Sequence, residues 1–270
     1  MVNINNDFYK LLEKIVKDHY AERGGRNKSG RKATVNIKHY CNVIMKVLTT
    51  GCQWNSLNEQ LHYSVYNKKF IEFVDCGIIE HFFYLLTLVN NKLQKVTGNF
   101  YIDTTIFRNM QGLEDISYNH KIKSKRGTKL SVIVDSNGSP VSLVCTSANY
   151  NDVTLVLPNY KKLNDKIRKN IKNIICDKGY ISKKLKENFE TTENINYIYP
   201  DKKNTLQENK NTDEEKKLLK TRSINENTFS WMTQYRRLMA RYEKYTKNFL
   251  GFIMLAFSNV ILNKLTKLKY

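Results

Sequence analysis

Apolar residues in the first third of the chain recur every three or four positions, a spacing that predicts helices. Near the start, this spacing is shared by Phe8, Leu11, Leu12 and Ile15. A longer stripe that ends before Gly51, a suitable C-cap, comprises Ile37, Tyr40, Val43, Ile44, Val47 and Leu48. Further apolar clusters continue to Val89, so residues 35–95 are expected to form several short helices. They suit a helix-turn-helix-like DNA-binding domain, and a plain helical packing module fits the pattern equally well.

From residue 99 the pattern changes to short alternating or continuous apolar runs, which predict strands. The expected strands are 99–105, 129–135, 141–147, 171–176 and 195–200. Turn residues between the second and third strands predict a hairpin. Helices are expected at about 153–163 and after Gly179 up to about Phe189. Asp152 is expected to cap the first of these helices or to support the residues of a metal site without binding the metal itself. This order predicts an α/β domain with a mixed sheet.

The C-terminal part begins with residues 201–220, whose polar composition indicates a solvated loop or a frayed helix. A helix with one apolar stripe is then predicted from Ile224, Thr228, Trp231, Tyr235, Leu238 and Tyr242. The most apolar segment, 249–262, is short for a membrane span and is interrupted by Ser258 and Asn259, so a buried helix is predicted. Residues 1–10 lack the apolar core of a secretory signal, and none is expected.

The net charge of the sequence predicts a binding partner. The 270 residues include 45 Lys and Arg against 25 Asp and Glu, a formal net charge of +20. This surplus predicts attraction to phosphate backbones or anionic membranes, and nucleic acid is the favoured partner. An AT-rich genome that enriches lysine and asparagine explains the same composition in part. The basic, glycine-containing segment 23–34 is either an arm that lies on a phosphate backbone or a solvated loop.

Cysteine and histidine give no sign of a structural metal or disulfide framework. The five cysteines form no CxxC pair, and the five histidines are scattered along the chain. A reduced intracellular protein without a zinc site is therefore expected, in the cytoplasm or nucleoid if the source is bacterial.

Three acidic residues carry the candidate chemistry. Asp103 lies at the end of the first predicted strand and Asp177 at the end of the fourth, and these strands can be neighbours in a mixed sheet. Strand ends hold carboxylates rigidly enough to bind Mg²⁺ or Mn²⁺. Each is alternatively a turn residue or a helix cap. Glu226 lies on the helix opposite its apolar stripe, four residues after Arg222, so a surface ion pair explains its position equally simply.

The sequence segments around these three acidic residues resemble those of a known family. The segments IDTT, KIKSKRGTKLSVIVDSNGSP, SANYNDV, CDKGYIS and ENTFSWMTQYRRLMARYEKYTKNFLGFIMLA occur in the order found in DDE transposases of bacterial insertion sequences. The chain is most similar to the insertion-sequence-five type, which is related to the Harbinger transposases of eukaryotes. The similarity extends over roughly residues 35–265.

The resemblance implies a ribonuclease-H-like mixed sheet with flanking helices, preceded by a small all-helical domain. It also implies a catalytic triad of Asp103, Asp177 and Glu226 that holds two Mg²⁺ or Mn²⁺ ions for phosphoryl transfer. The Arg-x-x-x-Glu spacing is kept. Leu219 and Thr233 occupy the positions where relatives have tyrosine and lysine. The resemblance therefore does not determine which residues contact the DNA ends at these two positions.

Basic residues near these motifs are candidate DNA contacts, and each is alternatively a solvated surface charge. They are Lys123, Lys125, Arg126, Lys178, Arg222, Arg236, Arg237 and Arg241.

The expected protein is a transposase that cleaves double-stranded DNA at transposon ends and transfers the freed strand to target DNA. Its expected organisation is an N-terminal helix and basic arm (1–34), a helical DNA-binding domain (35–95) and a catalytic domain (96–270). It is expected to act as a homodimer or a larger assembly, without a membrane. The alternatives are a domesticated or viral DNA-binding protein or nuclease with the same core, and a plain basic interaction module.

Overall fold

The computed structural model describes residues 4, 6–22, 35–94, 96–123, 125–202 and 210–267. The predicted basic arm, 23–34, lies outside the described residues. The rest falls into two compact units. The first lies within Met1–Leu86, Met110–Gly112 and Met232–Tyr270, and the second within Thr87–Asn109 and Leu113–Trp231. Residues 232–270 thus belong to the first unit, although the sequence placed them with the catalytic region. The predicted domain boundaries stay predictions.

Helices make up the first unit. They are α1 (Asn6–Glu22), α2 (Ile37–Thr50), α3 (Tyr63–Asp75), the first part of α4 (Ile78–Leu93) and α10 (Thr246–Lys267). Gly51 caps α2 in the left-handed conformation, as predicted, and its amide donates to the Val47 carbonyl. Phe70 of α3 stacks on Phe252 of α10 with ring centroids 4.1 Å apart. Helix contacts of this kind bury the predicted apolar stripes and make the unit's core.

The C-terminal helix α10 is the buried helix predicted at 249–262. By length and apolar composition it is the one described helix long enough to cross a membrane, but 72% of its apolar window is buried inside the protein. Gly251 allows a close approach to α3, since an added Cβ would lie 2.7 Å from a methyl group of Val74. The apolar residues of α10 are therefore explained by packing within the first unit.

The helix predicted to continue to Tyr242 ends earlier. Helix α9 spans Ile224–Thr233, and a separate 3₁₀ turn, η8, covers Arg236–Leu238. Tyr235 between them has an extended backbone, and its buried hydroxyl bonds to the side chain of Asn259 at 2.9 Å. The extended residue still buries its ring against α10, so the predicted stripe was wrong beyond Thr233.

Two buried arginines hold the segment after η8. Arg241 is fully buried and donates to the carbonyls of Glu243 and Lys244 at 3.1 Å each and to Thr246 Oγ1 at 3.2 Å. Arg237 is 7% exposed and its Nε lies 2.7 Å from Glu243 Oε1. Guanidinium groups inside a protein need such partners, because an unpaired buried charge is strongly destabilising.

The second unit contains a mixed sheet. In the described part of the chain its strands are β1 (Asn99–Arg108), β2 (Ser117–Asn119), β3 (Lys125–Val134), β4 (Pro140–Ser147), β5 (Asn173–Ile175) and β6 (Asn196–Ile198). The order is β2-β3-β1-β5-β6, with β4 also paired to β3. Strands β1 and β3 are antiparallel, whereas β1, β5 and β6 run parallel. The predicted α/β class with a mixed sheet and flanking helices is confirmed, and β2 was not predicted.

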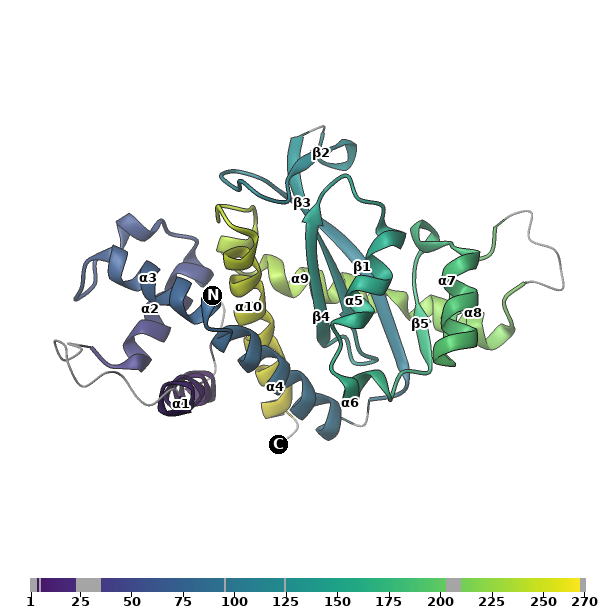
Figure 1. Cartoon of the computed structure of the whole chain (residues 1–270), viewed down its shortest axis with the longest axis horizontal. Helices are drawn as coiled ribbons and strands as arrows, with labels where there is room; N and C mark the ends of the chain where they lie inside the picture. The colour runs from purple at the N-terminus through teal and green to yellow at the C-terminus, as the bar shows by residue number, and fades with distance from the viewer. Residues whose placement is uncertain are drawn as a thin grey trace. The chain divides into compact units, whose positions relative to one another are not determined.

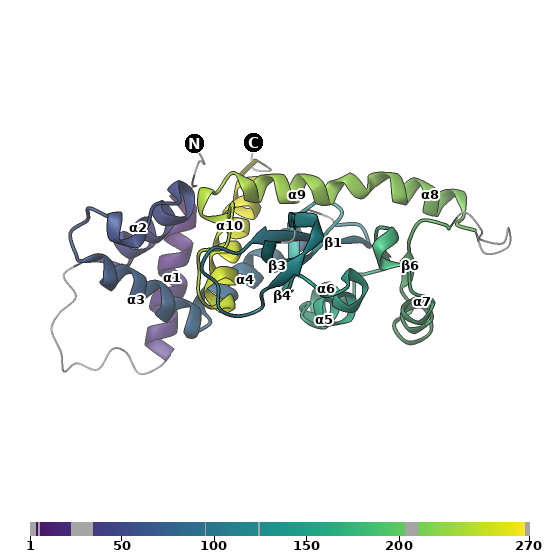
Figure 2. The ribbon, with the colours of Figure 1, turned by 90° about the horizontal axis from the view of Figure 1, so that it is seen from above.

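Helices cover both faces of this sheet (Figures 1 and 2). Helices α5 (Val156–Lys161) and α6 (Asp165–Arg168) lie on one face, and α7 (Lys183–Asn188) follows Gly179 as predicted. On the opposite face, α8 (Asp213–Lys220) and α9 follow one another along one line in Figure 2. A capping box formed by Thr212 and Glu215 starts α8 within the segment predicted to be loop or frayed helix. The sheet is therefore covered by helices on both of its faces.

Replacing Arg241 by glutamine is expected to lower the free energy of unfolding by about 2–4 kcal/mol, because buried carbonyl groups lose their charged donor. Urea unfolding of the full chain, followed by circular dichroism, measures this change. Arg236 is exposed, and Arg236→Gln is the matched control, with an expected change within about 0.5 kcal/mol. Equal stability of the two variants would contradict a structural role for Arg241.

Candidate active site

Strand pairing brings Asp103 and Asp177 together. Strands β1 and β5 are parallel, and Tyr101 pairs with Ile175. Asp177 follows the end of β5 by two residues, after the buried Cys176, and Asp103 follows Tyr101 by two residues within β1. Adjacent parallel strands lie about 4.8 Å apart, and the charge of Asp177 acts on Asp103, so the two carboxyl groups lie near each other beyond the end of β5. The sequence placed Asp103 at the end of its strand, but β1 continues to Arg108. The sequence prediction that their strands are neighbours is confirmed.

The surroundings of Asp103 disfavour its negative charge. Burial raises the pKa of its carboxyl group from 3.8 to about 6, and the charges of Asp177 and Asp152 add to this rise. The amide of Thr104, which donates to Asp103 Oδ1 at 2.7 Å, and the nearby Arg222 act in the opposite direction. A carboxyl group held beside other carboxylates in this way is typical of cation-binding and catalytic sites.

Asp177 is exposed and already holds one cationic side chain. Its Oδ1 accepts from Arg222 Nη1 at 2.8 Å and from the amide of Lys178 at 2.6 Å. Asp177 is also the N-cap of the short turn Lys178–Tyr180, as its alternative interpretation predicted. The cap and a role in the site are compatible, because both bonds go to the same oxygen.

Helix α9 is fixed on the sheet by contacts on both sides of Glu226. The hydroxyl groups of Tyr101 and Thr221 lie 2.7 Å apart, and Thr228 Oγ1 donates to the Gly138 carbonyl at 3.0 Å. Arg222, whose guanidinium group contacts Asp177, lies four residues before Glu226, in the 3₁₀ turn Thr221–Ser223 that precedes α9. Glu226 itself is exposed.

The structure does not assemble all three predicted acids. Within the described ranges, no group of three His, Cys, Asp or Glu side chains is close enough to hold a metal ion. Asp103 and Asp177 are brought together, while Glu226 stands on the adjoining helix flank. The buried neighbour of Glu226, Asn225, has a side-chain amide without a hydrogen-bond partner.

The predicted DNA contacts divide into three groups. Arg222 is half-buried and paired with Asp177. Arg237 and Arg241 are buried among internal partners, and this burial removes them from the candidate DNA contacts. The remaining five are exposed to solvent: Lys123, Lys125, Arg126, Lys178 and Arg236.

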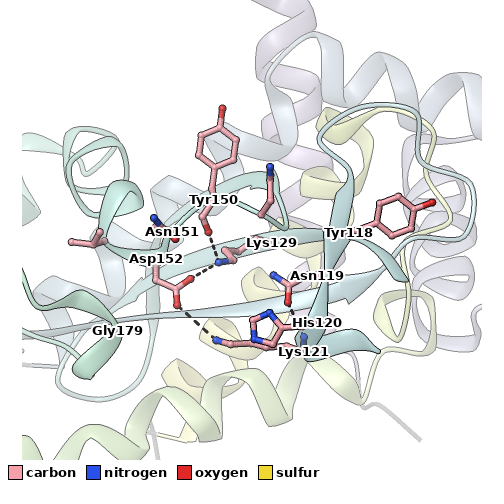
Figure 3. Close-up of a pocket in the computed structure, with 11 residues that line it drawn as sticks. Tyr118, Asn119, His120, Lys121, Lys129, Tyr150, Asn151, Asp152 and Gly179 are labelled. Atoms are coloured by element: carbon pink, nitrogen blue, oxygen red, sulfur yellow. Dashed lines mark hydrogen bonds and ion pairs between the residues drawn. The ribbon is translucent and has the colours of Figure 1, made fainter. Parts of the chain in front are cut away.

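A second polar cluster, which the sequence did not predict, surrounds Asp152, whose charge adds to the pKa rise of Asp103 (Figure 3). The buried Lys129 contacts Asp152 Oδ1 at 2.5 Å and the Tyr150 carbonyl at 2.5 Å. Lys121 lies 3.9 Å from Asp152 Oδ2. The prediction that Asp152 caps a helix was wrong. Asn151 occupies the N-cap position, and the carboxylate of Asp152 contacts Lys129 and Lys121 instead. The motif SANYNDV contains Asp152, but its partner Lys129 is a long-range contact.

Comparisons with known protein families and solved structures identify proteins that are similar to this chain. A protein-family model described as "Transposase DDE domain" matches residues 97–261, which include Asp103, Asp177 and Glu226. Among solved structures, the chain is similar to one titled "Cryo-EM structure of piggyBac transposase synaptic complex with hairpin DNA (SNHP)". That match has a TM-score of 0.50 and 11% sequence identity, and covers 94% of this chain and 73% of the other. At this identity the likeness concerns the fold alone. No curated protein matches the chain.

Changing Asp103 to asparagine is expected to stabilise the protein near neutral pH. The folded state binds the Asp103 proton more tightly than the unfolded state, so stability falls as pH rises from about 4 to about 6. Asp103→Asn removes this loss, and a gain of about 2–3 kcal/mol is expected above pH 7, shrinking to zero below about pH 4.

Urea unfolding across this pH range measures the difference from the unmodified chain. Asp165→Asn, at a side chain that is 81% exposed, is the control and is expected to change stability by less than about 0.5 kcal/mol. A constant difference between Asp103→Asn and the unmodified chain at every pH would show that the Asp103 pKa is not raised.

Proposed function

The chain belongs to the transposase DDE domain family, and on this basis we propose that it cuts double-stranded DNA at the ends of a mobile element and joins the freed strand to target DNA. Family membership confirms the transposase predicted from the sequence. The insertion-sequence-five type stays a prediction. The ribonuclease-H-like core is part of the proposal and is supported by the order β4-β3-β1-β5-β6, antiparallel on one side of β1 and parallel on the other.

One observation carries the proposed chemistry: the pairing of β1 with β5, which brings Asp103 and Asp177 near each other. Burial is the main cause of the raised pKa of Asp103, and the neighbouring carboxylates of Asp177 and Asp152 add to the rise. Carboxylate oxygens are the donors that Mg²⁺ and Mn²⁺ prefer, and Mg²⁺ is commonly held by one or two carboxylates together with substrate phosphates. The residues present therefore fit a divalent cation.

In this proposal Asp103 and Asp177 hold the metal ions, two in number, and Glu226 completes the ligand set from α9. The bound ions would supply charge neutralisation at the scissile phosphate and a more acidic water. Glu226 follows Arg222, whose guanidinium group contacts Asp177, by four residues. That spacing is compatible with its inclusion, and the family pattern is the reason for it.

The protein's own side chains have three tasks. Asp103 and Asp177 must stay ionised to hold the cations. Arg222 contacts Asp177 in the structure and is close enough to the pair to contact a phosphate there instead. Exposed cations, among them Lys178 directly after Asp177, bind the DNA backbone through charge and set its position without reading sequence.

The proposed partners are transposon-end and target DNA, bound by a homodimer or a larger assembly that holds two ends together. A cryo-EM title describes the structurally similar piggyBac transposase as part of a synaptic complex with hairpin DNA. That description supports DNA and an assembly as partners here, while the number of copies is part of the proposal.

Removing any one of the three acids is expected to abolish metal-dependent cleavage. Asp103→Asn, Asp177→Asn and Glu226→Gln should each lower the cleavage rate at least about a thousandfold, since each takes a ligand from the phosphoryl-transfer site. The substrate is a plasmid that carries this gene with its own flanking DNA, incubated with Mg²⁺ or Mn²⁺. Chelation by EDTA should stop the reaction of the unmodified protein.

Glu214→Gln is the matched control for Glu226→Gln, because Glu214 is an exposed glutamate on the preceding helix α8. It is expected to cleave like the unmodified chain. Asp103→Asn that still cuts in Mg²⁺ would contradict the proposed site. Cleavage without joined products would instead identify a nuclease on the same core, and binding without cleavage would identify a DNA-binding protein.

A further inference from the structure

Two tyrosine-containing segments meet at one edge of β3. Strand β2 pairs with β3 through Ser117↔Gly127, and β4 continues along the same edge through Thr128↔Ser147. Side chains then join the segments, since Asn119 Nδ2 donates to the Ala148 carbonyl at 2.6 Å and the Asn149 amide donates to Ser117 Oγ at 2.7 Å. The two ordered segments enclose a pocket.

This pocket, called here the edge pocket, has a volume of about 570 Å³. Small-ligand pockets commonly range from about 300 to 1,000 Å³, so the space exceeds what a single inorganic ion needs. The lining combines polar and charged side chains with tyrosine rings, and consists of Tyr118, Asn119, His120, Lys121, Lys129, Asn149, Tyr150, Asn151, Asp152, Val153 and Gly179.

Charge in the edge pocket favours an anionic ligand. Its one carboxylate, Asp152, is already neutralised by the buried Lys129 at 2.5 Å. Lys121 adds a second ammonium group that is mostly exposed, and His120 presents an imidazole beside it (Figure 3). The surplus of positive charge suits a phosphodiester.

Aromatic rings flank the pocket and project away from its polar centre (Figure 3). The side chain of Tyr118 is 63% exposed and that of Tyr150 is 54% exposed. The guanidinium group of Arg126 lies 5.4 Å from the centre of the Tyr118 ring, on a strand that already presents cations to solvent. Exposed rings next to a cationic pocket are the combination with which proteins bind unpaired nucleotides, because bases stack on rings while phosphates meet cations.

The edge pocket lies close to the paired carboxylates. Gly179, which lines it, follows Asp177 by two residues, and a Cβ added there would lie 3.5 Å from Asp152 Oδ2. Lys129 pairs with Ile106, three residues beyond Asp103 on β1. Three strand residues span about 10 Å, the rise of about three stacked bases. A strand that passes the carboxylates can therefore reach the pocket within a few nucleotides.

We propose that the edge pocket and its tyrosines, Tyr118 and Tyr150, bind an unpaired stretch of the DNA strand next to the phosphate that is cut. The inference rests on the proposed function, since it names where part of that substrate lies. A duplex uses its base faces for its own stacking and offers only phosphates here. An unpaired strand offers both phosphates and base faces, which matches both features of the pocket.

Binding of labelled DNA by the full chain tests this assignment. Fluorescence anisotropy in Ca²⁺ compares a blunt duplex with the same duplex carrying a short single-stranded tail, placed on either strand and at either end. One tailed form is expected to bind about tenfold more tightly than the blunt form, because stacking on exposed rings contributes that much per base. The Tyr118→Ala/Tyr150→Ala protein should lose this preference and keep its affinity for the blunt duplex.

Matched variants separate stacking from charge. Tyr118→Phe/Tyr150→Phe should keep the preference, because the rings remain. Tyr245→Ala removes a tyrosine that is 47% exposed but belongs to the first unit, and should change nothing. Lys121→Ala should reduce by about one the number of counterions released when the tailed DNA binds, measured as the slope of log affinity against log salt concentration. Equal binding of tailed and blunt DNA, or a preference that survives the double alanine change, overturns the proposal.

Asp103→Asn keeps this test independent of the proposed chemistry. That variant should lose cleavage yet retain the preference for tailed DNA, since the edge pocket is intact. A protein that shows the preference but never cleaves would contradict the proposed function alone. A protein that cleaves but binds both forms equally would contradict the edge pocket alone.

Discussion

The parallel pairing of β1 with β5 is the constraint on which the site depends. Asp103 and Asp177 are separated by more than seventy residues of sequence, and only the register Tyr101↔Ile175 sets them side by side. The antiparallel strands β3 and β4 support β1 from its other edge, while α5 and α6 cover one face. Two like charges beside each other raise the free energy of the metal-free protein, so the surrounding sheet has to hold them in place.

Much of this arrangement was predictable from residue patterns. Alternating apolar runs identified β1, β3 and β4, and the continuous run before Cys176 identified β5, because strands impose a period of two or full burial. Asp177 was recognisable as a strand-end acid, whereas Asp103, also predicted at a strand end, lies within β1, which continues to Arg108. Glu226 was not recognisable as a site residue, since its spacing fits a surface ion pair equally well, and only the family pattern distinguishes it.

The remaining features depend on contacts between distant segments. Strand β2 has three polar residues and exists because β3 offers it an unpaired edge. The break after Thr233 was hidden because Tyr235 and Leu238 keep a helical spacing while being buried through an extended residue and a 3₁₀ turn. Arg237 and Arg241 resemble DNA contacts by type, and only their burial shows that they bind the protein itself.

The short length of β5 has a consequence for the stage of folding at which Asp103 and Asp177 come together. Only three residues of β5, Asn173–Ile175, connect Asp177 to the sheet, and their partners Asn99–Tyr101 lie far away in sequence. Pairings between such distant segments form late in folding, because a long loop must close before the contact stabilises it. The acid pair is therefore expected to assemble only with the finished sheet, and a partly folded chain keeps the net positive charge of the sequence without the paired carboxyl groups.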